Sequence, residues 1–239
     1  DRGSEAAIRE TLHRATPELG LLGEEFGQEG SERDRWIIDP LDATKNFVAG
    51  LPYFAILIGL ELDGELVFGA VHAPALGPGA GLSATPADRE SASLGETWWG
   101  ARGEGAWGST GTCLETCRQR RLRVSETAEI EQAFIVHGGL KLFQRHGHWP
   151  AFSELIARAD RTRGFGDWWG HILVAEGRAD AMIEAEVALH DVAALKPILE
   201  AAGGVLQTRG GRPLVTGWMD GAFSANARLV GKVREAMGY

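Results

Sequence analysis

Residues 36–47 read Trp36-Ile37-Ile38-Asp39-Pro40-Leu41-Asp42-Ala43-Thr44-Lys45-Asn46-Phe47, an apolar run followed by two carboxylates. The apolar run at 36–38 predicts a short buried strand. We expect this strand to stop at Asp39-Pro40, with the proline fixing a turn before Asp42. The two carboxylates would then project into the space beyond the sheet, where α/β proteins usually bind ligands.

This carboxylate pair points to phosphoryl chemistry. Two carboxylates in one small volume repel each other, so they require a shared proton or a hard cation, for which Mg²⁺ is the common cytoplasmic choice. If Ala43 and Thr44 open a helix, their N–H groups offer a seat for a phosphate. A plainer interpretation stays open, in which Asp42 is only a helix N-cap and Asp39 only a turn residue.

Two other segments add carboxylates. Gly23-Glu24-Glu25 follows the apolar pair Leu21-Leu22 at a predicted strand end. His190-Asp191-Val192-Ala193-Ala194 opens a predicted helix, with Asp191 as its N-cap or a first-turn residue. Capping alone would also explain Asp191.

The surrounding pattern predicts a mixed, layered α/β protein without internal repeats. Ser4 is expected to cap a first helix that ends near Pro17, and Asp63-Gly64 is expected to join two strands as a β-hairpin. The predicted strands are 53–62, 66–72, 97–99, 133–137, 181–184, 205–208 and 222–225. The predicted later helices are 149–159, 169–176, 192–202 and 227–237. Glycine, alanine, serine and proline dominate 77–93, which predicts a loop or insertion.

Composition excludes several classes of protein. The chain has 239 residues, a formal net charge of −9 and 44% hydrophobic residues, which is enough to form a core. No apolar run reaches the roughly 18 to 20 residues of a membrane span, and the acidic balance argues against nucleic-acid binding. Cys113 and Cys117 support neither a disulfide framework nor a zinc site. We expect a soluble, cytoplasmic protein that acts on small molecules.

Taken together, the motifs resemble the inositol monophosphatase-like family of Mg²⁺-dependent, lithium-sensitive phosphatases. The matching pieces are Gly23-Glu24-Glu25, residues 36–47, and residues 190–194 with the trailing 200–204, in the family's order. Residues 163–170 resemble the bacterial histidinol-phosphate phosphatase branch. The resemblance implies the layered αβαβα sandwich of the inositol monophosphatase and fructose-1,6-bisphosphatase type. Residues 1–125 would carry most metal ligands, and residues 126–239 would supply Asp191 and substrate contacts within one structural unit.

The resemblance also assigns roles to individual residues. Glu24, Asp39 and the Leu41 carbonyl would hold a first Mg²⁺, and Asp39, Asp42 and Asp191 a second, in a site of two or three ions that lithium would inhibit. Thr44 and Asp1 match the pair that orients the attacking, metal-activated water. Asp42 and the N–H groups of Ala43 and Thr44 would bind phosphate. Asp167, Glu184 and His190 are candidates for substrate contacts, with helix capping as an equal alternative for Asp167. Relatives are commonly homodimers.

Several features depart from the family pattern. Ala43 replaces a usual glycine, which is tolerated if it begins a right-handed helix and not at a positive φ. His190 replaces a usual tryptophan. We interpret it either as a polar contact to the substrate or as a tolerated change in packing. Residues 77–94 and 109–121 are extra length, and relatives carry a helix and loop ahead of the position of Asp1, so we expect that the natural start is missing. The substrate stays open among histidinol phosphate, inositol monophosphate, sugar phosphates and specialised metabolites, and a non-catalytic phosphate-ester-binding protein is a further alternative.

Overall fold

The computed structural model describes residues 1–76, 95–110, 119–211 and 219–239. They form two compact units, one of residues 1–121 with 193–198 and the other of residues 122–192 with 199–239. Each unit contains one β-sheet and packed helices, which confirms the mixed α/β class. The predicted insertion at 77–94, most of that at 109–121, and both cysteines lie outside the described residues. Among the described helices, none is long and apolar enough to cross a membrane.

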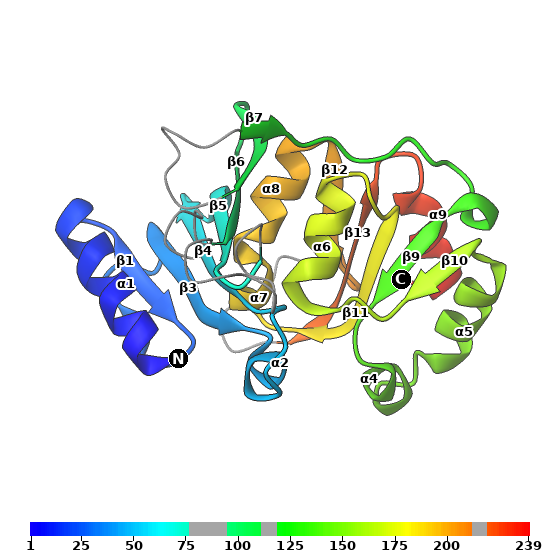
Figure 1. Ribbon diagram of the computed structural model, residues 1–239, viewed down its shortest axis with the longest axis horizontal. Helices are drawn as coiled ribbons and strands as arrows, with labels where there is room; N and C mark the ends of the chain where they lie inside the picture. The colour runs from blue at the N-terminus through cyan, green and yellow to red at the C-terminus, as the bar shows by residue number, and fades with distance from the viewer. Residues whose placement is uncertain (77–94, 111–118, 212–218) are drawn as a thin grey trace, which may run out of the picture. The chain divides into compact units, whose positions relative to one another are not determined.

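The first unit is built on an eight-stranded sheet (Figure 1). Its strands are β1 (Gly20–Gly23), β2 (Gly27–Glu29), β3 (Arg35–Asp42), β4 (Ala55–Leu62), β5 (Glu65–Ala73), β6 (Glu96–Ala101), β7 (Gly105–Thr110) and β8 (Gln119–Arg121). The order is β2-β1-β3-β4-β5-β6-β7-β8, and only the β1–β3 pair is parallel among these neighbours. The parallel pair matters for the site, because its carboxyl ends meet at one sheet edge.

The predicted hairpin is confirmed by β4 and β5. Asp63 and Gly64 connect the strands, with φ values of 54° and 78°. Positive φ at both central residues is the signature of the tight turn that matches the twist of paired strands. The strand predicted at 97–99 is also confirmed, as the centre of β6, and Trp98 is fully buried in the core.

The helix α1 (Arg2–Ala15) packs on β3, and the short helix α2 (Thr44–Val48) follows that strand. The predicted first helix is confirmed, but the prediction that Ser4 caps it is wrong, because the helix begins at Arg2 and its N-cap is Asp1, three residues before Ser4. The Ser4 hydroxyl donates a hydrogen bond to the Pro40 carbonyl at 3.3 Å, so Ser4 joins α1 to β3.

The second unit contains a five-stranded sheet with the order β10-β9-β11-β13-β12. Its strands are β9 (Phe134–His137), β10 (Arg161–Arg163), β11 (Ala181–Val187), β12 (Gly204–Thr208) and β13 (Asp220–Asn226). Its helices are η1 (Ile130–Gln132), α4 (Leu140–Arg145), α5 (Trp149–Arg158), α6 (Asp167–Ala175) and α9 (Val230–Met237). Every strand and helix predicted between 133 and 184 is confirmed within a few residues, as are the strands at 205–208 and 222–225.

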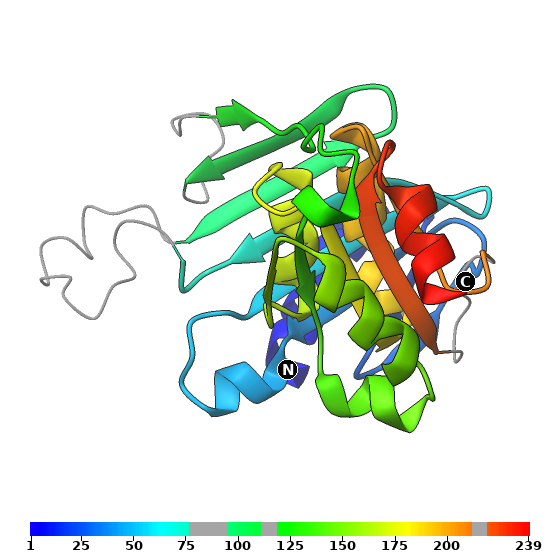
Figure 2. The same cartoon turned by 90° about the vertical axis from the view of Figure 1, so that its right-hand side faces the viewer.

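Alternation along β11 assigns its side chains to two different faces. Ile183 joins the hydrophobic cluster that includes Phe152 of α5 and Val233 of α9. In Figure 2, α5 and α9 lie side by side on that face of the sheet. Met182 and Glu184 point to the opposite face, which α6 covers. Glu184 is therefore an acidic residue placed in a buried layer between a sheet and a helix.

The helix predicted at 192–202 is wrong as a single element. The structure has α7 (Leu189–Ala193) and α8 (Leu195–Ala201) instead. Pro197 explains the break, because a proline inside a helix lacks an N–H and its ring clashes with the carbonyl four residues earlier, here that of Ala193. Ala194, between the two helices, packs directly on Gly69 of β5. A Cβ added to Gly69 would lie only 1.8 Å from the Ala194 carbonyl oxygen.

Candidate active site

The segment from Asp39 to Asp42 lies within β3 and is not the turn that the sequence predicts. Asp39 is opposite Leu57 and Asp42 is opposite Ala55, so three steps on β3 match two steps on β4. This register shift is a β-bulge, a place where a central strand tolerates a proline such as Pro40. Leu57 and Ala55 point to the same face of β4, so the bulge puts Asp39 and Asp42 on one face as well.

Glu24 lies beside Asp39 because β1 and β3 run parallel. Gly23 is paired with Ile38, and the Glu24 N–H donates to the Ile38 carbonyl at 3.2 Å. Glu24 directly follows Gly23, the last residue of β1, and Asp39 directly follows Ile38 in β3. One carboxylate oxygen of Glu24 lies within 4.8 Å of one from Asp39. Asp39 is only 2% exposed, whereas Glu24 is exposed.

Local hydrogen bonds hold the backbone of the bulge. The Leu41 N–H donates to Asp39 Oδ1 at 3.0 Å, which fixes that carboxylate against its own strand. The Thr44 hydroxyl donates to the Leu41 carbonyl at 2.9 Å. Because the single hydroxyl proton is used there, the Thr44 oxygen faces any further partner as an acceptor. The bulge thus presents Asp39, Asp42, the Leu41 carbonyl and Thr44 from six consecutive residues.

Ala43 adopts a left-handed conformation, with φ 66° and ψ 42°, as the N-cap of α2. The condition under which alanine would be tolerated, a right-handed start of the helix, is therefore not met. For a residue with a Cβ this conformation costs about 1–2 kcal/mol. The helix begins at Thr44, and the first N–H groups of a helix have no acceptor within it. Asp1 is exposed at the start of α1.

In the second unit, Glu184 and Asp167 are in direct contact. The Asp167 N–H donates to Glu184 Oε1 at 2.8 Å, at the first residue of α6. Asp167 has a φ of 56°, and Gly166, not Asp167, is the helix N-cap. Glu184 is buried and Asp167 is exposed, so a buried carboxyl lies beneath an exposed one.

Two carboxyl groups of this cluster hold their protons more tightly than usual. Burial, reinforced by the Asp167 carboxylate, raises the pKa of Glu184 to about 8, and the nearby Asp191 acts in the same direction. The Asp167 N–H opposes the shift. Burial also raises the pKa of Asp191, against the opposing effect of His190. A cation close to Glu184 and Asp191 would favour the charged forms that burial disfavours.

Asp191 is a first-turn residue of α7. Its Oδ2 accepts a hydrogen bond from the Ala188 N–H at 2.7 Å. Ala188 directly precedes the helix and Asp191 is its third residue, and a side chain at this position bonds in the same way in a capping box. His190 Nε2 lies 3.2 Å from Asp191 Oδ1, and both side chains are partly exposed. The capping role expected for Asp191 is therefore present and uses one of its oxygens.

Sequence reasoning missed Glu5. This residue of α1 is fully buried, and its carboxylate accepts hydrogen bonds from the turn that contains Glu24. A signal was present, because Glu5, Ile8 and Leu12 have the spacing of one helix face, so a carboxylate stands on the apolar side.

Helix α6 also contributes two large buried side chains to the core. Trp168 is a core residue, and His171 is buried with its Nδ1 2.9 Å from the Ser224 hydroxyl. Burial lowers the pKa of His171 to about 3.

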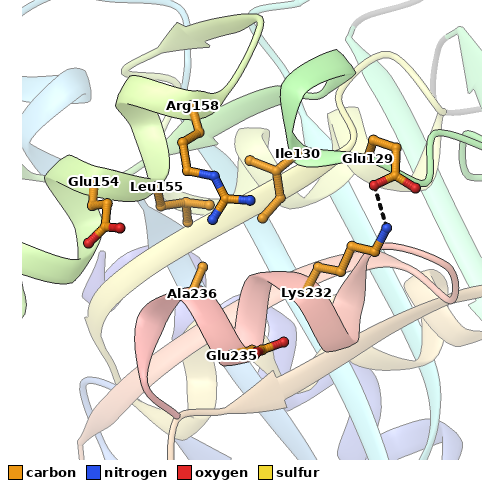
Figure 3. A pocket seen from close by; sticks show the side chains of 8 residues that line it. All are labelled: Glu129, Ile130, Glu154, Leu155, Arg158, Lys232, Glu235 and Ala236. Carbon is orange, nitrogen blue, oxygen red and sulfur yellow. Dashed lines mark hydrogen bonds and ion pairs between the residues drawn. The ribbon is translucent and has the colours of Figure 1, made fainter.

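A separate pocket of about 510 Å³ lies between α5, α9 and η1 (Figure 3). Its lining is Glu129, Ile130, Glu154, Leu155, Arg158, Lys232, Glu235 and Ala236. Lys232 is paired with Glu129 across the pocket, and Arg158 with the neighbouring Glu131. None of the predicted site residues lines it.

Comparisons with known proteins identify the family. The model of the inositol monophosphatase family matches residues 1–237. A histidinol-phosphatase from Mycobacterium tuberculosis is 39% identical over 212 residues, covering 88% of this chain and 73% of that protein. An inositol-1-monophosphatase from Rhizobium meliloti is 34% identical over 226 residues, covering 91% of this chain and 74% of that protein.

A solved structure of an inositol monophosphatase from Zymomonas mobilis has the same fold. It superimposes with a TM-score of 0.79 at 25% identity and covers 100% of this chain and 83% of that one. The expected fold type is thereby confirmed. The chain belongs to the inositol monophosphatase family and is a phosphoric monoester hydrolase.

Proposed function

We propose that this enzyme hydrolyses histidinol phosphate, a small phosphate monoester that carries an amine, with Mg²⁺ as its cofactor. The observation that carries the substrate proposal is the acidic cluster of Glu184, Asp167 and Asp191. A structure with acidic groups at these positions favours a cationic substrate over a neutral polyol. The 39% identity to a protein named histidinol-phosphatase supports the same choice.

The donor set of the first unit fits Mg²⁺. Glu24, Asp39 and Asp42 are carboxylates, the Leu41 carbonyl is a hard oxygen donor, and Mg²⁺ prefers such ligands. We propose that Glu24, Asp39 and the Leu41 carbonyl hold one ion, and that Asp39, Asp42 and Asp191 hold another. When bound, the ions would neutralise phosphate charge and make a water acidic enough to attack near neutral pH. A third ion and inhibition by lithium are part of the proposal, by family resemblance.

The protein groups would position the reactants. The Thr44 oxygen, whose proton is engaged by the Leu41 carbonyl, is suited to accept a hydrogen bond from the attacking water, and we propose Asp1 as its partner in that role. The N–H groups of Ala43 and Thr44, with Asp42, would orient the phosphate at the positive end of α2. Catalysis would consist of positioning and charge stabilisation.

Glu184 and Asp167 would bind the substrate amine. A cation close to Glu184 offsets the burial that disfavours its charged form, so substrate and carboxylate stabilise each other. We propose His190 as a further polar contact, because its Nε2 is already oriented by Asp191.

We also propose that the portions before and after residue 125 work as one unit, that the enzyme is cytoplasmic and that it forms a homodimer. Family resemblance supports these points. Light scattering coupled to size-exclusion chromatography measures the oligomeric state directly.

A phosphate-release screen with Mg²⁺ tests the function. Histidinol phosphate, inositol 1-phosphate, fructose 1,6-bisphosphate and a nucleoside monophosphate are compared by kcat/KM. We expect the highest value for histidinol phosphate, and background rates for Asp39→Asn with every substrate. A higher kcat/KM for a substrate without an amine would contradict the substrate proposal, and full activity of Asp39→Asn would contradict the site.

A further inference from the structure

Glu5 occupies an unusual place in α1. It is the one buried residue of this helix, with 0% exposure, although Ile8 and Leu12 share its face. A buried carboxylate is unfavourable unless it is paired and hydrogen-bonded. Glu5 meets this requirement within the first unit, so its burial has a structural purpose.

The partners of Glu5 belong to the turn that carries Glu24. The Glu25 N–H donates to Glu5 Oε2 at 2.8 Å, and the Phe26 N–H donates to Glu5 Oε1 at 3.3 Å. Arg9, one turn further along α1, donates from Nε to Glu5 Oε1 at 2.7 Å. Arg9 also donates from its other nitrogens to the Gly27 carbonyl and to Glu29. Side chains of helix α1 therefore bind the backbone of residues 25, 26 and 27 and the carboxylate of Glu29.

The glycine at position 23 has a physical explanation in the same contact. An ideal Cβ on Gly23 would lie 1.8 Å from Glu5 Oε1 and 2.2 Å from its Cδ. No side chain fits there while Glu5 keeps its hydrogen bonds. The first residue of the Gly23-Glu24-Glu25 motif thus makes room for Glu5.

We infer that Glu5 is a positioning residue that aims Glu24 at the metal site. Glu24 has its own N–H bound to the Ile38 carbonyl, and the next two N–H groups are bound to Glu5. Three consecutive peptide groups are thus fixed, one by β3 and two by α1. With its backbone held in this way, the Glu24 side chain can change its direction only by changing its rotamer. The inference rests on the proposed role of Glu24 as a metal ligand.

Metal binding by the full-length chain without substrate tests this role. The variants are Glu5→Ala, which removes the acceptors, and Glu5→Gln, which keeps one acceptor oxygen. The matched control is Thr16→Val, because the Thr16 hydroxyl accepts a hydrogen bond from Trp36 Nε1 at 2.9 Å and so joins α1 to β3 away from Glu24. Mn²⁺ binding is measured by calorimetry, and amide hydrogen exchange is measured at residues 25 and 26.

We expect Glu5→Ala to weaken Mn²⁺ binding about 10- to 100-fold, as loss of outer-shell partners does in other metal sites. Glu5→Gln should lose less, and Thr16→Val should lower the unfolding midpoint with unchanged Mn²⁺ affinity. Exchange at residues 25 and 26 should accelerate only in the Glu5 variants. If Glu5→Ala does not fold, Glu5→Gln supplies the comparison.

Two results would overturn the inference: Mn²⁺ affinity equal to wild type in a folded Glu5 variant, or an equal loss in Thr16→Val. Failure of the proposed function looks different, because the wild-type chain would then release no phosphate from any monoester while its Mn²⁺ titration still reports on Glu5. A wild-type chain that binds no Mn²⁺ would refute both.

Discussion

Replacing Ala43 by glycine should stabilise the enzyme. Ala43 has a φ of 66°, where a residue with a Cβ loses about 1–2 kcal/mol relative to the right-handed region. Glycine removes this penalty but makes the unfolded chain more flexible, which costs about 0.4–1 kcal/mol. The midpoints of these two ranges differ by about 0.8 kcal/mol, which predicts a net stabilisation. For a chain of this size that corresponds to a rise of about 1–4 °C in Tm.

A matched control lies in the same short helix. Ala49 is the C-cap of α2, with a φ of −79° and an exposed side chain. Ala49→Gly therefore pays only the unfolded-state penalty and should destabilise the enzyme by about 0.4–1 kcal/mol. Urea unfolding of the wild type and of both variants gives the two changes with opposite signs. A loss of stability in Ala43→Gly equal to that in Ala49→Gly would refute the reasoning, because the position would then be unstrained.

Three further outcomes follow from the site and the core. Glu184→Gln should lower kcat/KM for histidinol phosphate about 10- to 100-fold, the value of one charged hydrogen bond, and should change the value for inositol 1-phosphate far less; equal losses would argue against an amine contact. His171 has a folded pKa of about 3 against 6.5 when unfolded, so its contribution to stability is complete above pH 6.5 and is lost as the pH falls toward 3. Between pH 7 and pH 5 His171 should lower the free energy of unfolding by about 2 kcal/mol. Urea unfolding of His171→Gln at the two pH values should not show this decrease. If the stability of the variant falls with pH as much as that of the wild type, the decrease belongs to other groups. Treatment with EDTA should abolish phosphate release and Mg²⁺ should restore it, whereas activity that survives EDTA would contradict the metal assignment.

Local chemistry explains the sequence predictions that succeeded. Alternation and apolar runs located the strands, because a side chain's face in a strand depends only on its own position. The Asp63-Gly64 turn was recognisable because its two residue types tolerate the required positive φ. The residue types of the candidate site could be recognised for a similar reason. A carboxylate in a short motif can bind a cation whatever its position in the fold.

The predictions that failed depended on neighbours in space. Pro40 suggested a turn, but pairing with β4 keeps the segment in the strand and absorbs the proline in a bulge. Pro197 did break the predicted helix at 192–202, and a stricter application of the proline rule to that segment would have found the break. Ser4 lost its capping role because α1 begins at Arg2.

By itself, the sequence determined the class of fold, which follows from periodicity and element order, and the carboxylates that suit a divalent cation. Its ordered motifs also carried the resemblance to the family. Only the tertiary structure decided how those groups are held. The bulge turns Asp39 and Asp42 to one face, the parallel pairing of β1 and β3 brings Glu24 beside Asp39, and burial places Glu5 under the turn after β1. Each of these depends on the register between strands or on burial, which are set by contacts between residues distant in the chain.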